Sequence, residues 1–404
     1  MPQPTSTPTP VSALPTERPT GCPFDPPAEL GPLRTEAPLR RMTYPDGHVG
    51  WLATGHAAVR AVLADPRISI RYELLHYPLP GLPIDSLPPA SPGDLTGVDP
   101  PEHTRYRKLL TGKFTVRRMR ALTDRIEQFA AEALDAMQRT EAPVDLVAAY
   151  ARPIPALMIC ELLGVPYEDR QQFQRNAEIV TGNTPSEQTE PAWNALHEFM
   201  AGLVATKQAT PTNDLLPDLT GSDLTDQELT TLGVVLLGAG LDTTANMLAL
   251  GTFALLQHPD QLATLRADPA LIDSTVEELL RYLTITHTMV RAATEDVEIG
   301  GQLIKAGETV TLSTQAANRD PARFPNPDAL DLYRTATGHL AFGHGIHQCL
   351  GQQLARVQMR VAFPALLSRF PSLRLAIPPN EVPLRTDGGA IYGAHHLPVT
   401  WDPH

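Results

Sequence analysis

Most apolar positions along this chain recur at the three-to-four-residue spacing of helices. The pattern is largely helical from residue 119 to residue 210, with interruptions at 142–144, 164–166 and 181–192. Strand-like stretches are short, and two of them flank a Pro-Asp-Gly turn at 45–47, which predicts a β-hairpin. The sequence therefore predicts a mainly α fold with small β-sheets and enough chain for a large core.

The longest predicted helix begins at a capping box, with Thr225 as the N-cap and Glu228 as the third helical residue. It can continue to about Gln257, because His258 and Pro259 follow. Roughly 33 residues at ~1.5 Å each give a rod of roughly 50 Å, long enough to cross a whole domain. Its middle is apolar on all sides, so we expect a buried central helix.

Small and polar residues interrupt the middle of this helix in the run Gly-Ala-Gly-Leu-Asp-Thr-Thr at 238–244. Glycine and paired threonines weaken a helix, and a buried aspartate is costly without a partner. Such local conflicts are expected at functional sites. A structural interpretation is equally open for this run by itself, since Thr243 can donate a hydrogen bond to the carbonyl of Ala239 and merely bend the helix.

One cysteine marks a second candidate site, in the run His-Leu-Ala-Phe-Gly-His-Gly-Ile-His-Gln-Cys-Leu-Gly at 339–351. Cys349 precedes a helical pattern, and the N-terminus of a helix favours a thiolate. The glycines before it permit tight turns and the close approach of a flat partner. A lone cysteine is also compatible with a buried apolar role. With His344 and His347 it can form part of a zinc site, although no fourth ligand lies close by in the sequence.

The pattern Phe-Gly-x-Gly-x-His-x-Cys-x-Gly in this run resembles the haem-binding loop of cytochromes P450. The residues that fill it are Phe342, Gly343, Gly345, His347, Cys349 and Gly351. The resemblance extends from about Asp46 to the C-terminus. It implies haem b with Cys349 as the axial ligand of the iron, an arrangement that favours O–O cleavage. It also implies the P450 fold, a single domain with the long central helix over the haem.

The same resemblance gives the interrupted part of the central helix a role. The P450 motif Ala-Gly-x-[Asp/Glu]-Thr is filled by Ala239, Gly240, Asp242 and Thr243. In the family the small residues leave room for O2, and the threonine hydroxyl hydrogen-bonds the bound oxygen. The acid connects this hydroxyl to a proton path from solvent. Next to Cys349, this functional interpretation outweighs a merely bent helix.

Polar residues elsewhere are implied to hold the haem. His103 and Arg107 lie at i and i+4 of the helix that opens at Asp99, so they share one face. The resemblance implies that they bind a haem propionate. It assigns the same task to Arg291, with His347 of the cysteine loop as a further partner. Arginine suits a carboxylate because its planar fork can bind both oxygens.

A second capping box is predicted at Ser274 and Glu277. The following Glu278 and Arg281 are spaced as in the family's Glu-x-x-Arg pair, which is structural and locks to an arginine before the cysteine loop. Arg334 occupies that place. We assign these residues to the fold and not to catalysis.

The substrate pocket is predicted from segments that carry little regular pattern. Residues 72–98 are rich in proline and glycine, and in P450s this position is the loop over the haem. The interruption at 181–192 and its flanking helices would correspond to the family's mobile lid, and residues 170–215 are expected to help build the pocket. Residues 285–290 and the turn that begins at Ala390 are expected to face the pocket as well.

Composition narrows the partners and the compartment. The formal net charge of −13 argues against nucleic acid. Three widely spaced cysteines do not make a disulfide framework, which fits a reducing cytoplasm. Residues 1–22, rich in Pro, Thr and Ser, predict a disordered lead-in to one domain over 23–404, without the features of a signal peptide or anchor. The longest apolar stretch, Leu232 to Leu241, is too short to cross a membrane. We therefore expect a soluble, cytoplasmic protein.

The resemblance implies a monooxygenase that inserts one atom of O2 into a C–H bond of a lipophilic small molecule, such as a macrolide, a sterol-like compound or a xenobiotic. No flavin or iron–sulfur motif is visible, so electrons are expected from a separate ferredoxin and its reductase. The basic residues expected to dock the ferredoxin near Cys349 are Arg105, Lys108, Lys113 and Arg356. Epoxidation, desaturation and oxidative coupling share every motif. A non-catalytic haem or lipophile sensor is a different class, against which the intact pair of Asp242 and Thr243 argues.

Overall fold

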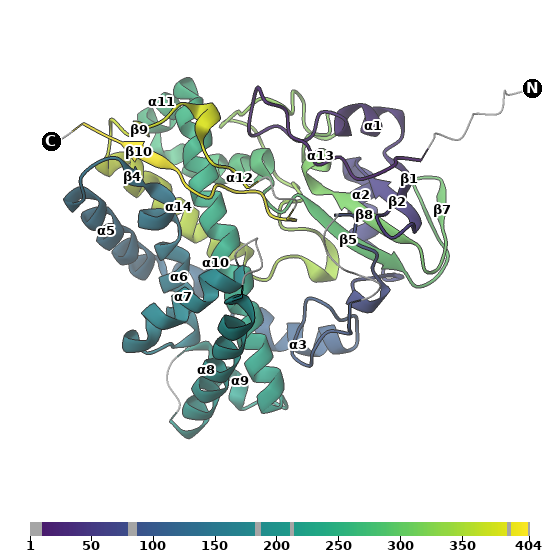
Figure 1. Ribbon diagram of the computed structural model, residues 1–404, viewed down its shortest axis with the longest axis horizontal. Coiled ribbons are helices and arrows are strands. Elements are labelled where there is room, and N and C mark those ends of the chain that lie inside the picture. Colours follow the sequence, from purple (N-terminus) through teal and green to yellow (C-terminus); the bar gives the residue numbers. More distant parts are fainter. Residues whose placement is uncertain (1–9, 80–86, 182–186, 211–213, 386–388, 403–404) are drawn as a thin grey trace, which may run out of the picture.

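A single long helix, α10 (Asp226–Gln257), runs through the middle of the molecule (Figure 1). The computed structural model describes residues 10–79, 87–181, 187–210, 214–385 and 389–402. The predicted capping box is confirmed: the N–H of Glu228 donates to Oγ1 of Thr225 at 3.2 Å, and Oε2 of Glu228 accepts the N–H of Thr225 at 2.8 Å.

By length and composition alone, α10 could cross a membrane. However, 72% of its most apolar window is buried inside the protein. Because its apolar side chains are covered by neighbouring helices on most sides, α10 has the character of a core helix, as its all-round apolar pattern predicts.

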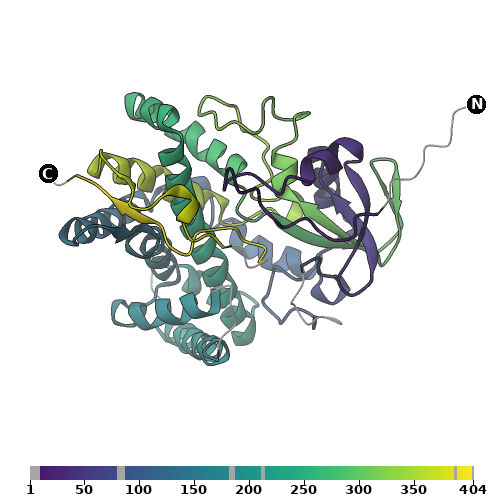
Figure 2. The ribbon, with the colours of Figure 1, turned by 45° about the horizontal axis from the view of Figure 1, so that its top comes forward.

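Helices gather around α10 on one side of the molecule (Figures 1 and 2). These helices are α5 (Thr123–Arg139), α6 (Pro153–Leu163), α7 (Arg170–Thr181), α8 (Thr189–Ala209), α9 (Leu215–Thr220), α11 (Pro259–Ala267), α12 (Ile272–Leu283) and α14 (Gln352–Arg369). The remaining helices are α1 (Leu30–Glu36), α2 (His56–Ala64), α3 (Glu102–Thr111), α4 (Val116–Arg120) and α13 (Thr314–Asn318).

The largest sheet lies at the opposite side of the molecule (Figure 1). Its order is β1 (Leu39–Thr43), β2 (Val49–Ala53), β8 (Thr309–Ser313), β5 (Thr288–Ala293) and β3 (Ile68–Ser69), and only β2 and β8 are parallel neighbours. The predicted hairpin is confirmed, since β1 pairs with β2 across the 45–47 turn, in which Gly47 has φ +86°. Two smaller sheets combine β4 (Val144–Asp145), β10 (Pro398–Thr400) and β9 (Arg374–Leu375), and β6 (Val297–Ile299) with β7 (Gln302–Ile304). The prediction of a mainly α fold with small sheets is confirmed.

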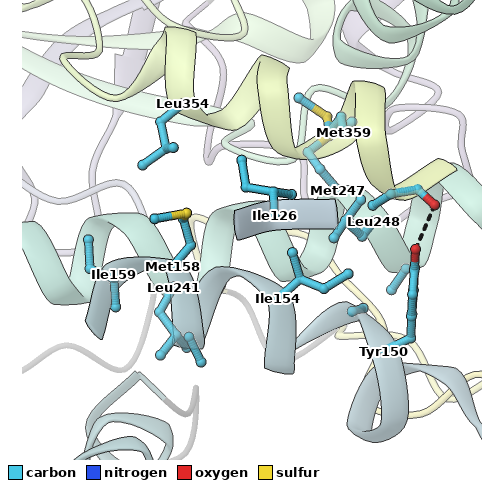
Figure 3. Close-up of a cluster of buried hydrophobic side chains, with 14 of the residues drawn as sticks. Ile126, Tyr150, Ile154, Met158, Ile159, Leu241, Met247, Leu248, Leu354 and Met359 are labelled. Carbon is cyan, nitrogen blue, oxygen red and sulfur yellow. Dashed lines mark hydrogen bonds between the residues drawn. The ribbon is translucent and has the colours of Figure 1, made fainter. Parts of the chain in front are cut away.

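A cluster of buried apolar side chains lies where α10 packs with α6 and α14 (Figure 3). Met158 of α6, Leu248 of α10 and Met359 of α14 are fully or almost fully buried there. Within this apolar layer the hydroxyl of Tyr150 has a hydrogen-bond partner, because it donates to the backbone carbonyl of Ala362 at 2.7 Å. Because a buried hydroxyl is costly without a partner, this bond lets an aromatic side chain fill the core.

The Pro- and Thr-rich segment at the start of the chain differs from its prediction. From residue 10 on it is packed against the rest: Val11 pairs with β1 as an isolated bridge, and Leu14 is buried. Arg18 donates to the carbonyl of Asp25 and to Oε1 of Gln315, both at 2.8 Å. Composition alone predicted disorder because it does not reveal these distant partners. Residues 1–9 lie outside the described residues.

The prediction of a second capping box is wrong. Helix α12 begins at Ile272, and the hydroxyl of Ser274 donates back to the carbonyl of Leu271 at 2.9 Å. The carboxylate of Glu277 instead accepts hydrogen bonds from His339 and Arg356. The tertiary partners outcompete the local motif because charge-assisted bonds are the stronger ones.

Candidate active site

The cysteine loop is held in shape by its own backbone. The N–H of Cys349 donates to the carbonyl of Phe342 at 2.9 Å, which closes the loop just before α14. Gly343 and Gly345 have φ values of +67° and +76°, in the left-handed region that favours glycine. A Cβ on Gly345 would lie 2.2 Å from the carbonyl oxygen of Leu63 in α2. Glycine is therefore required at this position by both conformation and space.

Gly351 has a different reason to be small. Its φ is −79°, and no atom lies within 4 Å of the place a Cβ would take. Neither backbone nor protein packing requires glycine there. The open space lies at the cavity wall, because Gly351 lines the cavity together with Cys349 and Leu350.

The thiol of Cys349 faces this cavity. Its surface is accessible, but the accessible part is cavity wall, well inside the protein envelope. Burial raises the pKa of the Cys349 thiol, while the backbone N–H groups of Gly351 and Gln352 and the guanidinium of Arg107 act to lower the pKa. The helix N-terminus thus favours the thiolate, as predicted, but less than burial opposes it. A bound metal ion would remove the thiol proton outright.

Two adjoining cavities, of about 220 and 470 Å³, meet above the cysteine. Cys349 and Phe342 form part of the wall of both, and Ala239 and Thr243 of α10 also line both. The structure thus brings the two predicted motifs, which are about a hundred positions apart, to one enclosed space. The walls are mainly apolar side chains, which suits a lipophilic occupant.

A cluster of nitrogen donors at this cavity makes no direct ion pair with a carboxylate among the described residues; Asp99 acts on Arg291 and His103 only as a nearby charge. Arg291 is buried and donates to the carbonyl of its neighbour Val290 at 2.7 Å. Burial lowers its pKa to about 10. The Nε2 atom of His347 is buried without a hydrogen-bond partner in the described part of the chain. Burial lowers the pKa of His347 to about 3, helped by the neighbouring His103, Arg291 and Arg107.

His103 and Arg107 join this cluster from α3, as predicted. The ring of His103 lies 4.1 Å from that of His347, centroid to centroid. Burial, followed by the charge of Arg107, lowers the pKa of His103. Arg107 donates to the carbonyl of Gln348 at 2.7 Å and lines the smaller cavity.

These residues fit haem by their chemistry. A flat macrocycle needs an apolar slot, a metal ligand on one face and donors for two carboxylates at its edge. The cavities offer the slot, Cys349 the thiol, and the cluster of Arg291, His347, His103 and Arg107 the donors. The orphaned Nε2 of His347 and the buried guanidinium of Arg291 are costly as they stand. Propionate groups would satisfy both.

The zinc alternative is not supported. Within the described residues no group of three or more His, Cys, Asp and Glu side chains converges in a way that can hold a metal ion. His344 and His347 lie in the same loop as Cys349, but they do not form a ligand set with it. A structural zinc site requires four such ligands around one point, and a catalytic zinc site requires three.

In α10 the small and polar run at 238–244 contains the hydrogen bond that is expected if the run merely bends the helix. The hydroxyl of Thr243 donates to the carbonyl of Ala239 at 2.8 Å. Thr243 nevertheless lines both cavities, so its hydroxyl lies at the surface that an occupant would contact. Both interpretations of the run therefore apply to this threonine. A Cβ on Gly240 would lie 3.1 Å from Cδ1 of Ile159 in α6, a tight contact that keeps this part of the wall narrow.

Asp242 has different partners from Thr243, although the two residues are neighbours in α10. Arg385 donates from Nη1 to Oδ2 and from Nη2 to Oδ1 of Asp242, both at 2.8 Å. The two side chains are only 4% and 7% exposed. Asp242 is not among the described residues that line either cavity. Arg385 was not predicted, because it lies 143 positions away in a segment without a local motif.

The predicted pocket segments are confirmed in part. Tyr72, Leu75 and Tyr77 line the larger cavity, and so do Ile285 to Arg291 in part and Ala390. None of the described residues of 170–215 lines either cavity. The expectation that this segment builds the pocket is therefore wrong for its described part. Residues 80–86, in the predicted loop over the haem, lie outside the described residues.

Three of the four predicted docking residues already have acidic partners. Arg105 pairs with Glu228 at 2.5 Å, Lys113 with Asp218 at 2.7 Å, and Arg356 with Glu277 at 2.6 Å. Lys108 is exposed on α3. Because a paired cation offers less attraction to a partner, Lys108 is the strongest of the four for docking.

Comparisons with known proteins agree with this geometry. A family model described as Cytochrome P450 matches residues 186–391. Cytochrome P450 105C1 of Streptomyces sp is 50% identical over 382 residues, which cover 94% of this chain and 96% of the relative. Vitamin D3 dihydroxylase of Streptomyces griseolus is 40% identical over 400 residues, which cover 97% and 96%. The crystal structure of GfsF superimposes with a TM-score of 0.91 at 44% identity, covering 97% of this chain and all of that one. The chain belongs to the cytochrome P450 family, and it is accordingly an oxidoreductase with haem iron and a cysteine thiolate ligand that acts on lipophilic molecules.

Proposed function

We propose that this cytochrome P450 inserts one oxygen atom from O2 into a C–H bond of a bulky lipophilic molecule, with Cys349 as the axial ligand. The observation that carries the proposal is the convergence of the Cys349 thiol, the unpartnered Nε2 of His347, the buried guanidinium of Arg291, and Thr243 on one apolar cavity. When bound, haem supplies O2 activation, for which the thiolate donates electron density.

The chain's own residues would bind and orient the haem and would exclude water from the site. Arg291, His347, His103 and Arg107 would hold the propionates and thereby fix the plane of the macrocycle. The apolar walls keep water away from the reacting centre, which strengthens every electrostatic interaction inside it. The hydroxyl of Thr243 is the group placed to pass a proton into the cavity, because it is both a donor and an acceptor.

The substrate class follows from the larger cavity. Apart from the residues that would hold haem, this cavity is lined by Tyr72, Leu75, Tyr77 and Met247, which suit an uncharged, lipophilic molecule. A relative named for the dihydroxylation of vitamin D3 supports a bulky lipophilic substrate. Product analysis separates hydroxylation from epoxidation, desaturation and oxidative coupling, which would use the same residues.

Electrons are proposed to come from a ferredoxin and its reductase in the cytoplasm. An acidic ferredoxin would dock on the face behind the cysteine loop. Lys108 supports this docking because it is exposed and belongs to α3, the helix that also carries His103 and Arg107. The free thiols of Cys22 and Cys160 agree with a reducing compartment.

The test is the difference spectrum of the reduced protein with carbon monoxide, for the wild type, Cys349→Ser and Cys22→Ser. We expect a strongly red-shifted Soret band in the wild type and in Cys22→Ser, and its loss in Cys349→Ser. Cys22 is a matched control because it lies away from the cavity lining. A band that survives in Cys349→Ser, or a wild-type protein that takes up no haem, would overturn the proposal.

A further inference from the structure

The start of the chain meets the C-terminal segment through one arginine and one tyrosine. The guanidinium carbon of Arg18 lies 3.6 Å from the centre of the Tyr392 ring. The hydroxyl of Tyr392 donates to the carbonyl of Pro23 at 2.7 Å. Residues 10–25, which we call the N-terminal strap, therefore hold the buried side chain of Tyr392 both by the face of its ring and by its hydroxyl.

Two further contacts fix the orientation of the Arg18 guanidinium. Nη1 donates to the carbonyl of Asp25 and Nη2 to Oε1 of Gln315 in α13, both at 2.8 Å. Burial lowers the pKa of Arg18 to about 10, so the side chain is still a cation at neutral pH. A cation over an aromatic ring is held more strongly when water is excluded. Arg18 thus joins the strap, α13 and the C-terminal segment at one point.

The backbone of Tyr392 belongs to the wall of the larger cavity. Its N–H donates to the carbonyl of Ile285 at 2.7 Å, and the N–H of His287 donates to the carbonyl of Ala390 at 3.2 Å. Ile285 and Ala390 both line the cavity. These two bonds join segments that are far apart in the sequence into one wall. The position of Tyr392 therefore decides where the C-terminal part of this wall lies.

The ring of His287 supports the wall from behind. Its Nε2 donates to the carbonyl of Gly389 at 2.9 Å. Burial, followed by the charge of Arg18, lowers the pKa of His287 to about 4, so the ring is neutral at pH 7. The strap lies outside the wall, because none of its described residues lines either cavity. It can therefore act on an occupant of the cavity only through the wall.

We propose that Arg18 is a positioning residue for substrate selectivity: by holding the ring of Tyr392 from outside, it fixes the wall made by residues 285–288 and 389–392 against a bulky occupant. The proposal rests on the proposed function, in which this cavity receives a lipophilic substrate. A wall that depends on one cation over one ring can open locally when that support is lost. A bulky ligand needs the closed wall, whereas a small ligand of the haem iron does not.

The first experiment measures hydrogen exchange of the backbone amides of Tyr392 and His287 in the haem-loaded wild type, Arg18→Met and Arg34→Met. We expect both amides to exchange about threefold faster or more in Arg18→Met, because local opening becomes easier without the ring contact. Arg34→Met is the matched control. Arg34 ties α1 to the carbonyl of Ala316 at 2.9 Å, so its loss loosens the start of the chain but keeps the contact with Tyr392. Both exchange rates should stay as in the wild type.

The second experiment titrates the same haem-loaded proteins with imidazole and with 1-tritylimidazole, and follows the Soret band. Both ligands bind haem iron through nitrogen, but only the second carries a bulky apolar body. We expect the dissociation constant of 1-tritylimidazole to rise about threefold or more in Arg18→Met, while that of imidazole stays within about twofold of the wild type. Arg34→Met should bind both ligands as the wild type does.

Three results would overturn the proposal. Unchanged exchange of the Tyr392 amide in Arg18→Met would mean that the wall does not depend on the strap. Equal weakening of both ligands would indicate a general loss of structure or of haem binding. Faster exchange with both dissociation constants unchanged would mean that Arg18 serves the fold alone. A failure of the proposed function looks different: loss of the thiolate signature in the carbon monoxide spectrum of the wild type would remove Cys349 as the ligand but leave the exchange result valid.

Discussion

Arg281 binds the carboxylate of Glu278 through two parallel hydrogen bonds, Nε to Oε2 at 2.7 Å and Nη2 to Oε1 at 2.8 Å, and both side chains are completely buried. Arg334 adds a bond from Nε to Oε1 of Glu278 at 3.0 Å. The remaining nitrogen of the guanidinium, Nη1 of Arg281, donates to the carbonyls of Asn318 and Pro327. One carboxylate and two guanidinium groups thus join α12 to the irregular segment before the cysteine loop.

Replacing Glu278 by alanine should destabilise the protein severely. It leaves two guanidinium groups without a counter-charge, and breaking a buried pair in this way costs about 3–5 kcal/mol. Denaturant unfolding, followed by far-ultraviolet circular dichroism, measures the loss. Asp273→Ala is the control: Asp273 pairs with Arg360 at 2.6 Å but is 71% exposed, so its loss should cost less than about 1 kcal/mol. Similar losses in the two variants would contradict the assignment of Glu278 to the fold.

The contrast between Arg334 and Arg385 shows what sequence can predict. Arg334 was predicted because the pattern around Glu278 and the cysteine loop resembles a family with a known arrangement. The central helix and its capping box were predictable because their signals are local. Arg385 meets Asp242 across 143 positions through an approach that depends on Gly393. No local signal encodes such a contact.

The same limit explains why the segments that line the pocket were predicted only in part. Segments next to a motif, such as 285–290, were placed correctly because the chain there is short and fixed at both ends. The described part of 170–215 consists mainly of helices α7 and α8, which pack on α10 and on each other. Helical periodicity shows that a face is buried but not which neighbour covers it. That choice is made by tertiary packing.

Arg291→Met should stabilise the haem-free protein and weaken its hold on haem. The guanidinium of Arg291 is buried and forms no ion pair with a carboxylate among the described residues, and burial outweighs the nearby charge of Asp99 in lowering its pKa, so removing its charge should relieve a desolvation cost. With haem bound, the same change removes a propionate contact. The measurements are the melting temperature of the haem-free protein and the rate of haem transfer to an excess of a haem-binding acceptor.

The control for Arg291 is Arg67→Met, at an exposed position. It should leave the rate of haem transfer unchanged. A lowered melting temperature of haem-free Arg291→Met, together with unchanged haem transfer, would show that Arg291 serves packing instead of cofactor binding.

Acid should lower the free energy of unfolding in part by protonating Glu277. Burial alone would raise the pKa of Glu277, but the hydrogen bonds from His339 and Arg356 outweigh it and lower the pKa to about 2. A carboxyl with a lowered pKa stabilises the fold fully above its unfolded pKa of about 4.3 and loses this contribution as pH falls through about 2. The difference between the folded and unfolded pKa of Glu277 corresponds to at most about 3 kcal/mol of stability.

The free energy of unfolding of Glu277→Gln, measured from pH 6 to pH 3, checks this sign. The variant should be less stable than the wild type at pH 6, and the gap should narrow as pH falls. A gap of constant size across this range would show that the carboxylate charge does not contribute.

Lys108→Ala should raise the KM for ferredoxin several-fold and leave a peroxide-driven reaction unchanged. An exposed charge at the rim of an interface mainly affects the rate of encounter. Lys305→Ala, in the turn between β7 and β8, is the matched control and should affect neither reaction. An equal loss in the ferredoxin-driven and peroxide-driven reactions would mean that Lys108 acts on the cavity and not on docking.

Thr243→Ala distinguishes an oxygen-activating enzyme from a haem-binding sensor. The hydroxyl of Thr243 is exposed to both cavities and bonded to the carbonyl of Ala239, so its loss should leave the helix intact while removing the proton donor from the cavity. Positioned proton transfer contributes about 100-fold or more to a reaction that needs it. We therefore expect product per reductant to fall by about tenfold or more, while reductant consumption continues. Thr243→Ser keeps the hydroxyl and should recover most of the coupling. If Thr243→Ala retains full coupling, protons reach the cavity by a route that does not include this residue. If neither the wild type nor the variant consumes reductant with any lipophilic substrate, the sensor is the better description.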